Sequence, residues 1–192
     1  MMRRVANLAV FLIAILLCYG MQTTKPHYAD LTGPIPAYGA ISNTVHTRTF
    51  DIGVDKVVFA RTLKFDQFGK QKLLTTGGVW AIVTANLAAT KDSAMVAAAT
   101  WRGPDGLSYR ASERASLATG GLPMALDPGV PAKTRMVFEI LPSQADEAML
   151  LVSGKLFAPL DSEARIALGP VALQADGMPE GTVETYELGK TF

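Results

Sequence analysis

The residue types that most often carry out chemistry are scarce in this 192-residue chain. It contains two histidines, His27 and His46, and one cysteine, Cys18. Zinc sites are built mainly from cysteine and histidine, so a zinc site here would need carboxylates for most of its ligands. His27 lies in a Pro-rich segment and His46 begins a predicted strand, and we expect both at the surface or in hydrogen bonds. We therefore expect no metal site and no cofactor.

Motifs for nucleophilic catalysis and phosphate binding are also missing. The Gly-x-Ser-x-Gly elbow that places a serine nucleophile on a tight turn does not occur. The pairs Gly77-Gly78 and Gly120-Gly121 lack the following Gly-Lys-Ser/Thr that would place a lysine and a hydroxyl on phosphates. We interpret both pairs as turns, and we expect Gly77-Gly78 to break the chain before the next strand.

Two groups of carboxylates remain as candidates for acid–base chemistry or cation binding. They are Asp146 with Glu147, and Asp161 with Glu163. Neighbouring surface acids are the simpler interpretation. A hydrolase would require two acids from distant segments to converge in one cleft, so this is the third-ranked hypothesis, and we expect that the protein is not an enzyme.

The charge distribution argues against nucleic acid as a partner. The formal net charge is +1, and basic and acidic residues are interspersed along the chain. Binding to a phosphate backbone needs a clustered basic face. The densest group, Lys64, Lys70 and Lys72, is interpreted as a solvated loop.

A basic start and a long apolar run mark the N-terminus. Arg3 and Arg4 precede a run from Val5 to Met21, which has the form of a signal peptide or signal anchor. As a helix the run would span roughly 25 Å, slightly less than a hydrocarbon core of about 30 Å. The side chains expected to face lipid are Val5, Leu8, Phe11, Leu12, Ile13, Ile15, Leu16 and Leu17.

The sequence leaves open whether this leader is cleaved. Cleavage after Gly20 would put Cys18 and Gly20 at the small-residue positions of a signal-peptidase site, a poorer match than Ala-x-Ala. We favour an uncleaved, single-pass anchor in the cytoplasmic (inner) membrane, with residues after about 22 on the extracytoplasmic or periplasmic side. Leu17 is larger than the residue that usually precedes a lipidated cysteine, so we interpret Cys18 as inert.

Residues 22–43 predict a linker because prolines and glycines interrupt any helical or strand periodicity. Pro34 and Pro36 favour extended backbone. Such a linker could hold the next domain away from the bilayer. The alternative is an irregular strap docked on that domain through Tyr28, Ile35 and Tyr38.

Residues 44–169 predict an all-β domain, and residues 170–192 a C-terminal extension that forms an edge strand or a tail. Short β-branched and aromatic runs alternate with Gly, Pro and Asp, as is typical of a β-sandwich. An Ala-rich helix over residues 87–100 is the main rival, but residues 91–93 interrupt it and we favour two strands. The strands expected are Val45–Ile52, Lys56–Phe65, Val79–Ala88, Ala94–Trp101, Ser108–Ala111, Thr134–Leu141, Met149–Leu156 and Glu163–Leu168.

Two turns support this spacing. The sequence from Gly103 to Gly106 is Gly-Pro-Asp-Gly, which predicts a tight reversal and therefore a hairpin. Asp127-Pro128-Gly129 has the same character before the Thr134 strand.

The order of these features resembles bacterial immunoglobulin-like extracytoplasmic domains of unknown function. The resemblance covers roughly residues 45–157. It rests on a Gly-started strand ending at Asn86, a strand entering the Asp105-Gly106 turn with Tyr109 beyond it, and Pro128-Gly129 before an apolar strand. It implies an immunoglobulin-like β-sandwich on a membrane or lipid anchor and no shared active site.

Two functions follow as ranked hypotheses. The first is a non-enzymatic, membrane-anchored accessory or adaptor module that binds a protein partner in the cell envelope. The alternative is an extracytoplasmic protein that binds a small ligand in a pocket lined by Trp80, Trp101 or Tyr109. The two tryptophans are more often core residues than ligand platforms.

Overall fold

A computed structural model describes residues 2–25, 31–156 and 158–189 of the chain. It has two compact units, Met1–Gly33 and Pro34–Phe192, and each is described by itself. His27 and Tyr28, for which surface and strap roles were predicted, lie outside the described residues.

The first unit contains helix α1, Met2–Thr23. Its segment Arg3–Thr23 has a mean hydropathy of 2.0 and is long and apolar enough to cross a membrane, as signal sequences also are. The side chains predicted to face lipid are exposed on this helix; that of Leu8 lies outside the described residues. The predicted N-terminal signal or transmembrane helix is therefore confirmed at that level.

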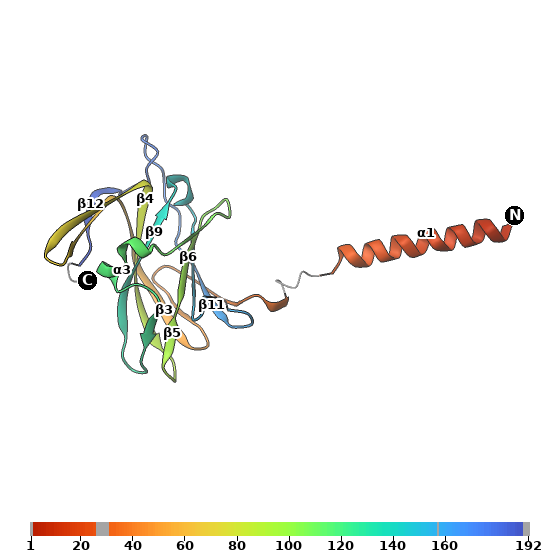
Figure 1. Cartoon of the computed structure of the whole chain (residues 1–192), viewed down its shortest axis with the longest axis horizontal. Helices are drawn as coiled ribbons and strands as arrows, with labels where there is room; N and C mark the ends of the chain where they lie inside the picture. Colours follow the sequence, from red (N-terminus) through yellow and green to blue (C-terminus); the bar gives the residue numbers. More distant parts are fainter. Residues whose placement is uncertain (1, 26–30, 157, 190–192) are drawn as a thin grey trace. The chain divides into compact units, whose positions relative to one another are not determined.

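The second unit is a β-sandwich, as the sequence predicted (Figure 1). One sheet has the strand order β1 (Ile35–Ala40), β11 (Ser162–Ala167), β10 (Met149–Ser153), β6 (Ala98–Arg102) and β7 (Ser108–Arg110). The other has the order β12 (Val183–Glu187), β3 (Phe50–Gln67), β4 (Lys70–Ala89) and β9 (Ala132–Ile140), with β2 (Thr44–His46) also paired to β3. The smaller elements are the pair β5 (Ala94–Val96) and β8 (Met124–Leu126), and the short helices η1 (Glu113–Ala115), α3 (Ser116–Thr119) and η2 (Pro142–Gln144).

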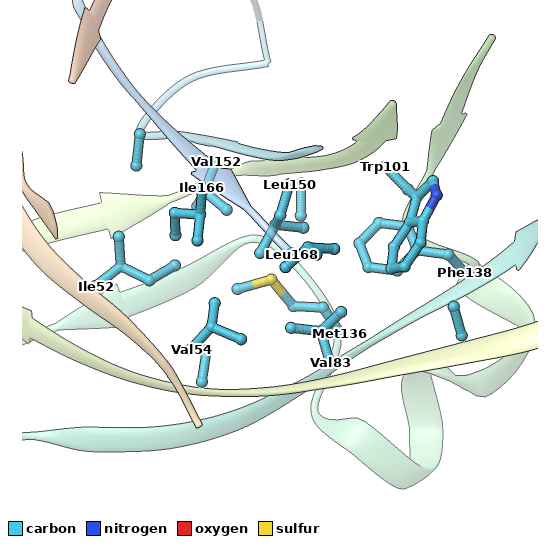
Figure 2. Close-up of a cluster of buried hydrophobic side chains, with 14 of the residues drawn as sticks. Ile52, Val54, Val83, Trp101, Met136, Phe138, Leu150, Val152, Ile166 and Leu168 are labelled. Atoms are coloured by element: carbon cyan, nitrogen blue, oxygen red, sulfur yellow. The ribbon is translucent and has the colours of Figure 1, made fainter. Parts of the chain in front are cut away.

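The main core lies between the two sheets. Alternate residues of each strand point inward because successive side chains of a strand face opposite sides of the sheet. Figure 2 shows them meeting: Ile52 and Val54 from β3 and Met136 from β9 face Leu150 and Ile166 of the other sheet. Burial of large aliphatic side chains stabilises a fold by about 1.5–3 kcal/mol each, so this layer dominates the stability of the sandwich.

A second, smaller core covers the outer face of β3 and β4. Trp80 and Ile82 of β4 point away from the main core and pack with Leu63 and Phe65 of β3 and with Leu188. Both faces of β4 are buried over Val79–Ala85.

The structure corrects the interpretation of Gly77-Gly78. Both glycines lie inside β4, where the register with β3 shifts between Ala60 and Thr62. The β3–β4 hairpin thus continues past the sandwich instead of ending there. Gly78 is required at this bend, because a Cβ atom on it would clash with the carbonyl oxygen of Ile140 in β9.

The linker prediction is wrong for Ile35–Ala40. This segment is strand β1, which pairs in parallel with β11. Pro36 is tolerated because an edge strand needs hydrogen bonds on one side only. Ile35 and Tyr38, expected to anchor a strap, are 57% and 67% exposed, and the half-buried Ala37 packs on the core instead.

The C-terminal extension is an edge strand over part of its length. Strand β12 pairs in parallel with β3, and Leu188 is buried in the second core. The compact unit therefore begins ten residues before the predicted boundary at residue 44 and extends beyond 169.

Two turns and the strands around the Ala-rich segment agree with prediction. The Gly103–Gly106 turn joins β6 to β7, and Gly129 has a left-handed φ of 76° in the turn before β9. Residues 94–102 form β5 and β6, and no helix is present there. The predicted break between Val45–Ile52 and Lys56–Phe65 is wrong, because β3 runs through both from Phe50 to Gln67. The break lies earlier, between β2 and β3, where the Thr47 hydroxyl accepts from the Phe50 N–H in a turn.

Candidate functional site

The strand directions define two ends of the sandwich. We call the end where β1 begins the proximal end: the Ile35 N–H donates to the Asp161 carbonyl at 2.8 Å, and β11 begins at Ser162. Arg48, just before β3, donates to the Asp161 carboxylate at 2.7 Å, so β3 also starts there. The 18 residues of β3 lead away to the opposite, distal end. In Figure 1 the yellow turn that joins β3 to β4 lies on the side of the sandwich away from β11.

The turn of the β3–β4 hairpin is an exposed aromatic tip. Gln67 pairs with Lys70, so Phe68 and Gly69 form a two-residue turn, with left-handed φ values of 51° and 76°. This is the pattern of a type I′ turn, which favours Asn-Gly. A residue with a Cβ atom in left-handed backbone costs about 1–2 kcal/mol. Phe68 nevertheless occupies that position and is 93% exposed, more than any other large hydrophobic side chain that the structure describes.

Basic and polar side chains surround this aromatic ring. Lys70 and Lys72 are exposed on β4 and line a hollow with Phe68, Gln67 and Gln71. Lys64, grouped with them in the sequence, contacts Glu187 of β12 at 3.4 Å. Residues 67–72, here called the distal tip, therefore combine one apolar group with two solvated cations.

A separate groove opens between the edges of β6 and β9. Its volume is about 300 Å³, and η1 and α3 lie along it. The walls include Ala99 of β6 and Met136 of β9, and charged groups are contributed by Arg110, Glu113 and Arg135. The mixed lining suits a small amphipathic molecule.

Of the three predicted ligand residues, Trp101 and Tyr109 are cross-strand neighbours, and Trp80 lies apart from them in the second core. Trp101 is fully buried in the main core, where its indole N–H donates to the Gln144 carbonyl at 2.8 Å. Its ring meets Phe59 edge-on at 6.1 Å. Tyr109 is half-buried at the margin of the same core, opposite Trp101 across β6 and β7. None of the three lines the groove.

Trp80 lies on the other side of β4. It is fully buried in the second core, beneath the Arg114 guanidinium, which lies 5.2 Å from the ring centroid. Arg114 also donates to Glu139 at 2.7 Å. The two tryptophans therefore stabilise two different cores, as the core interpretation expected.

The two carboxylate groups lie at opposite ends of the β10–β11 hairpin. Met149 pairs with Ala167 at one end, near Asp146, and Ser153 pairs with Glu163 at the other. Asp146 accepts from the Val171 N–H at 2.9 Å, and Glu163 accepts from Arg165 at 2.9 Å. The convergent pair that the hydrolase hypothesis requires is not formed by these residues.

Asp161 is a structural carboxylate at the proximal end. It is 8% exposed and binds Arg48 at 2.7 Å and Lys155 at 3.3 Å. Burial opposes its ionisation, but the N–H of Ser162 and the cations of Lys155 and Arg48 outweigh burial and lower the pKa of the Asp161 carboxyl. The charge pair closes the β10–β11 loop onto the start of β3.

Of the two histidines, the structure describes His46. His46 is exposed and lies 2.9 Å from Asp51, so its predicted surface or hydrogen-bonding position is confirmed. Within residues 2–25, 31–156 and 158–189, no three His, Cys, Asp or Glu side chains are grouped to hold a metal ion.

Comparison with known proteins identifies the fold and no family. No family model matches the chain, and no curated protein does. The chain is similar to the crystal structure of the yjhA protein from Bacillus subtilis, with 14% identity and a TM-score of 0.52 over 68% of this chain and 99% of that one. This likeness shows a shared sandwich fold.

Two further solved structures align with lower scores. One is an uncharacterized β-sandwich protein from Clostridium difficile 630, with 12% identity and a TM-score of 0.45 over 74% of this chain and 99% of that chain. The other is the secreted protein MPT63 from Mycobacterium tuberculosis, with 14% identity and a TM-score of 0.49 over 69% of this chain and 98% of that chain.

Proposed function

We propose that this chain is a non-enzymatic, membrane-anchored accessory module that presents its distal tip to a protein partner in the cell envelope. The observation that carries the proposal is the position of Phe68. It is almost fully exposed in strained backbone, at the end of the sandwich opposite the start of β1. Exposed aromatic side chains are enriched as anchors of protein interfaces.

The strain at Phe68 supports binding over folding. A turn of this type would be more stable with asparagine, so folding alone does not account for a phenylalanine there. Inserting the ring into a pocket of a partner would bury most of its apolar surface, worth about 1.5–3 kcal/mol. Lys70 and Lys72 beside it favour a partner with an acidic rim.

The apolar helix provides the anchor in this proposal. Segment Arg3–Thr23 has 21 residues, and a helix of that length rises roughly 30 Å, enough for the hydrocarbon core. Arg3 and Arg4 would hold the N-terminus in the cytoplasm. The chain would then cross the cytoplasmic (inner) membrane once, with the sandwich on the extracytoplasmic side.

We further place the sandwich among the bacterial immunoglobulin-like extracytoplasmic domains. The supports are the motifs between residues 45 and 157 and the shared fold with the Bacillus subtilis structure. Such scaffolds serve many functions, so the distal tip and not the fold supports the proposed binding of a protein partner.

Site-specific photocrosslinking in intact cells tests the proposed interface. The full-length chain carries benzoyl-phenylalanine in place of Phe68, and the matched control carries it in place of Leu107, a 48% exposed residue after the β6–β7 turn at the same end. We expect one discrete crosslinked protein at position 68 and at least tenfold less at position 107. Equal labelling at both positions, or none at 68, would contradict the proposal.

The groove favours small-ligand binding as a second candidate function. Its 300 Å³ can hold a compact molecule, although its lining residues differ from those predicted. Native mass spectrometry of the full-length protein in detergent should then show a bound small molecule, absent from an Ala98→Trp variant that fills the groove. A ligand retained by that variant would exclude the groove as its site.

A further inference from the structure

Four exposed apolar side chains lie at the proximal end of the sandwich, at the start of β1, in the β10–β11 loop and in β5. They are Ile35, Met95, Leu156 and Leu160, which are 57%, 51%, 82% and 60% exposed. We call them the proximal rim. Apolar side chains exposed singly are ordinary, but a row of four at one end of a domain indicates a binding surface.

Backbone contacts place the segments that carry these residues next to one another. Ile35 begins β1 beside Ser162, and Leu160 precedes Asp161, whose carbonyl accepts the Ile35 N–H. Leu156 lies in the same β10–β11 loop, which Lys155 and Asp161 close at 3.3 Å. Met95 is next, because a Cβ atom built on Gly154 would lie 3.0 Å from the Met95 carbonyl oxygen.

Folding of the sandwich does not require these side chains. Leu160 has a left-handed φ of 53°, which is unfavourable for a branched side chain, and it remains exposed. Leu160 therefore resembles Phe68 at the distal end, which also combines a left-handed φ with an exposed apolar side chain. The loop therefore holds an apolar group outward at a cost in stability.

We infer that the proximal rim inserts into the interfacial region of the bilayer that α1 spans. The inference rests on the proposed membrane anchor. Eleven residues separate Thr23 from Ile35, so the covalent chain can extend at most about 40 Å between them. Ile35 is itself a rim residue, so this connection joins the sandwich at the rim.

The charges beside the rim suit phospholipid headgroups. Arg48 and Lys155 are 68% and 64% exposed, and both flank the buried Asp161 carboxylate. Their aliphatic stems can follow apolar surface while the cations reach phosphate, and each basic residue near an anionic leaflet contributes about 1 kcal/mol. The rim thus combines apolar side chains that can insert into the bilayer with neighbouring side chains whose net charge is positive.

Seating the rim on lipid would orient the whole sandwich. Strand β3 runs from this end to the distal tip over 18 residues, which span at most roughly 60 Å. The distal tip would stand tens of ångströms from the bilayer, where a partner could reach it. The sandwich would then act as a spacer of defined direction.

Depth-dependent quenching in vesicles tests this inference. Full-length protein with Cys18→Ser receives a single cysteine in place of Leu156 or Leu160, labelled with an environment-sensitive fluorophore. The vesicles contain three parts phosphatidylcholine to one part phosphatidylglycerol, with or without a headgroup-level nitroxide lipid. We expect the nitroxide to reduce fluorescence at least twofold at both rim positions and to leave labels at Phe68 and Leu107 unchanged.

A label at Leu12 in α1, measured with a nitroxide lipid that carries its label at the middle of the acyl chain, separates the two proposals. Quenching at Leu12 without quenching at the rim would overturn the inference and leave the anchor intact. Loss of quenching at Leu12 as well would overturn the proposed anchor. A rim label that shifts to the blue without nitroxide quenching, increasingly at higher protein density, would identify a second copy of the chain as the occupant and also overturn the inference.

A rim variant provides the final control. Leu156→Asp with Leu160→Asp should reduce nitroxide quenching of a label at Met95 at least twofold, because carboxylates oppose insertion. Leu107→Asp at the distal end should leave it unchanged. Unaltered quenching at Met95 in the double variant would contradict insertion through the rim.

Discussion

At the residue scale, Phe68 shows how a single side chain can conflict with its local backbone. The two-residue turn needs positive φ at both positions, and Gly69 meets that need without strain. Phe68 meets it at a cost and gains no burial in return. Residues that destabilise a fold without an evident structural return are expected at functional positions.

Phe68→Asn should therefore stabilise the protein. Asparagine tolerates the left-handed region, so we expect the free energy of unfolding to rise by about 1 kcal/mol, measured by urea denaturation in detergent. The same variant should abolish partner binding at the tip. Leu107→Asn, another exposed apolar residue near a distal turn, serves as control and should change stability by less than about 0.5 kcal/mol. A destabilised Phe68→Asn would mean that the ring contributes to folding.

Asp161 should make stability depend on pH. Its folded pKa is lowered, so its stabilising effect is fully present above the unfolded pKa of about 3.9 and is lost as pH falls through the folded value. Asp161→Asn should lower the free energy of unfolding by about 1–2 kcal/mol at pH 7, since its cationic partners are largely exposed. That difference should shrink as the pH falls below about 4.

Denaturation of the wild type and Asp161→Asn at several pH values between 7 and 2.5 measures this difference. Asp66→Asn, at an exposed position of the β3–β4 hairpin, is the control and should have an effect below about 0.5 kcal/mol throughout. A pH-independent effect of Asp161→Asn would show that the carboxylate charge is not what stabilises the loop.

At the element scale, the β3–β4 hairpin serves both cores and the distal tip. The part of the hairpin away from its turn contributes Ile52 and Val83 to the main core. The part between Gly78 and the turn contributes Leu63 and Leu74 to the second core. The irregular pairing near Gly77 and Gly78 allows one pair of strands to contribute side chains to both cores. The second core holds the extension in place, so the tip is presented on a supported element.

The two glycines should respond differently to the same substitution. A methyl group on Gly78 would clash with the Ile140 carbonyl, whereas Gly77 has open space around its Cβ position. We expect Gly78→Ala to lower the free energy of unfolding by about 2 kcal/mol or more, and Gly77→Ala to change it by less than about 1 kcal/mol. Thermal unfolding followed by tryptophan fluorescence reports the effect. Similar values for both variants would contradict the role assigned to the bend.

At the scale of the whole molecule, the arrangement joins an apolar helix to a sandwich with distinct surfaces at its two ends. The proximal rim and the distal tip are separated by the length of β3, so each can bind without interfering with the other. In this proposal the first contacts lipid and the second contacts a protein.

The proposed architecture requires the leader to be retained. We expect protein recovered from membranes to have the intact mass of residues 1–192 and to resist extraction at alkaline pH, because a spanning helix inserts almost irreversibly. A mass lacking residues 1–20 would instead identify a signal peptide and a released sandwich. An added lipid on Cys18 would overturn the interpretation of Leu17.

Local patterns in the sequence were enough to predict the all-β class, the apolar helix and several turns. The short β-branched and aromatic runs and the Gly-Pro-Asp-Gly turn after Trp101 act over a few residues, so they can be recognised without knowing the partners of each strand. The absence of familiar catalytic motifs limited the functional hypotheses in the same way. Neither kind of pattern indicated which surfaces would be exposed.

Only the tertiary structure decided the positions that matter most for the proposed function. Strands β1 and β12 pair in parallel with partners more than a hundred residues away, and such pairing leaves no short-range signal in a Pro- or Gly-rich segment. The separation of Trp80 from Trp101 depends on which face of each sheet is covered. The exposure of Phe68 and Leu160 likewise depends on what packs beside them, and that is a property of the assembled fold.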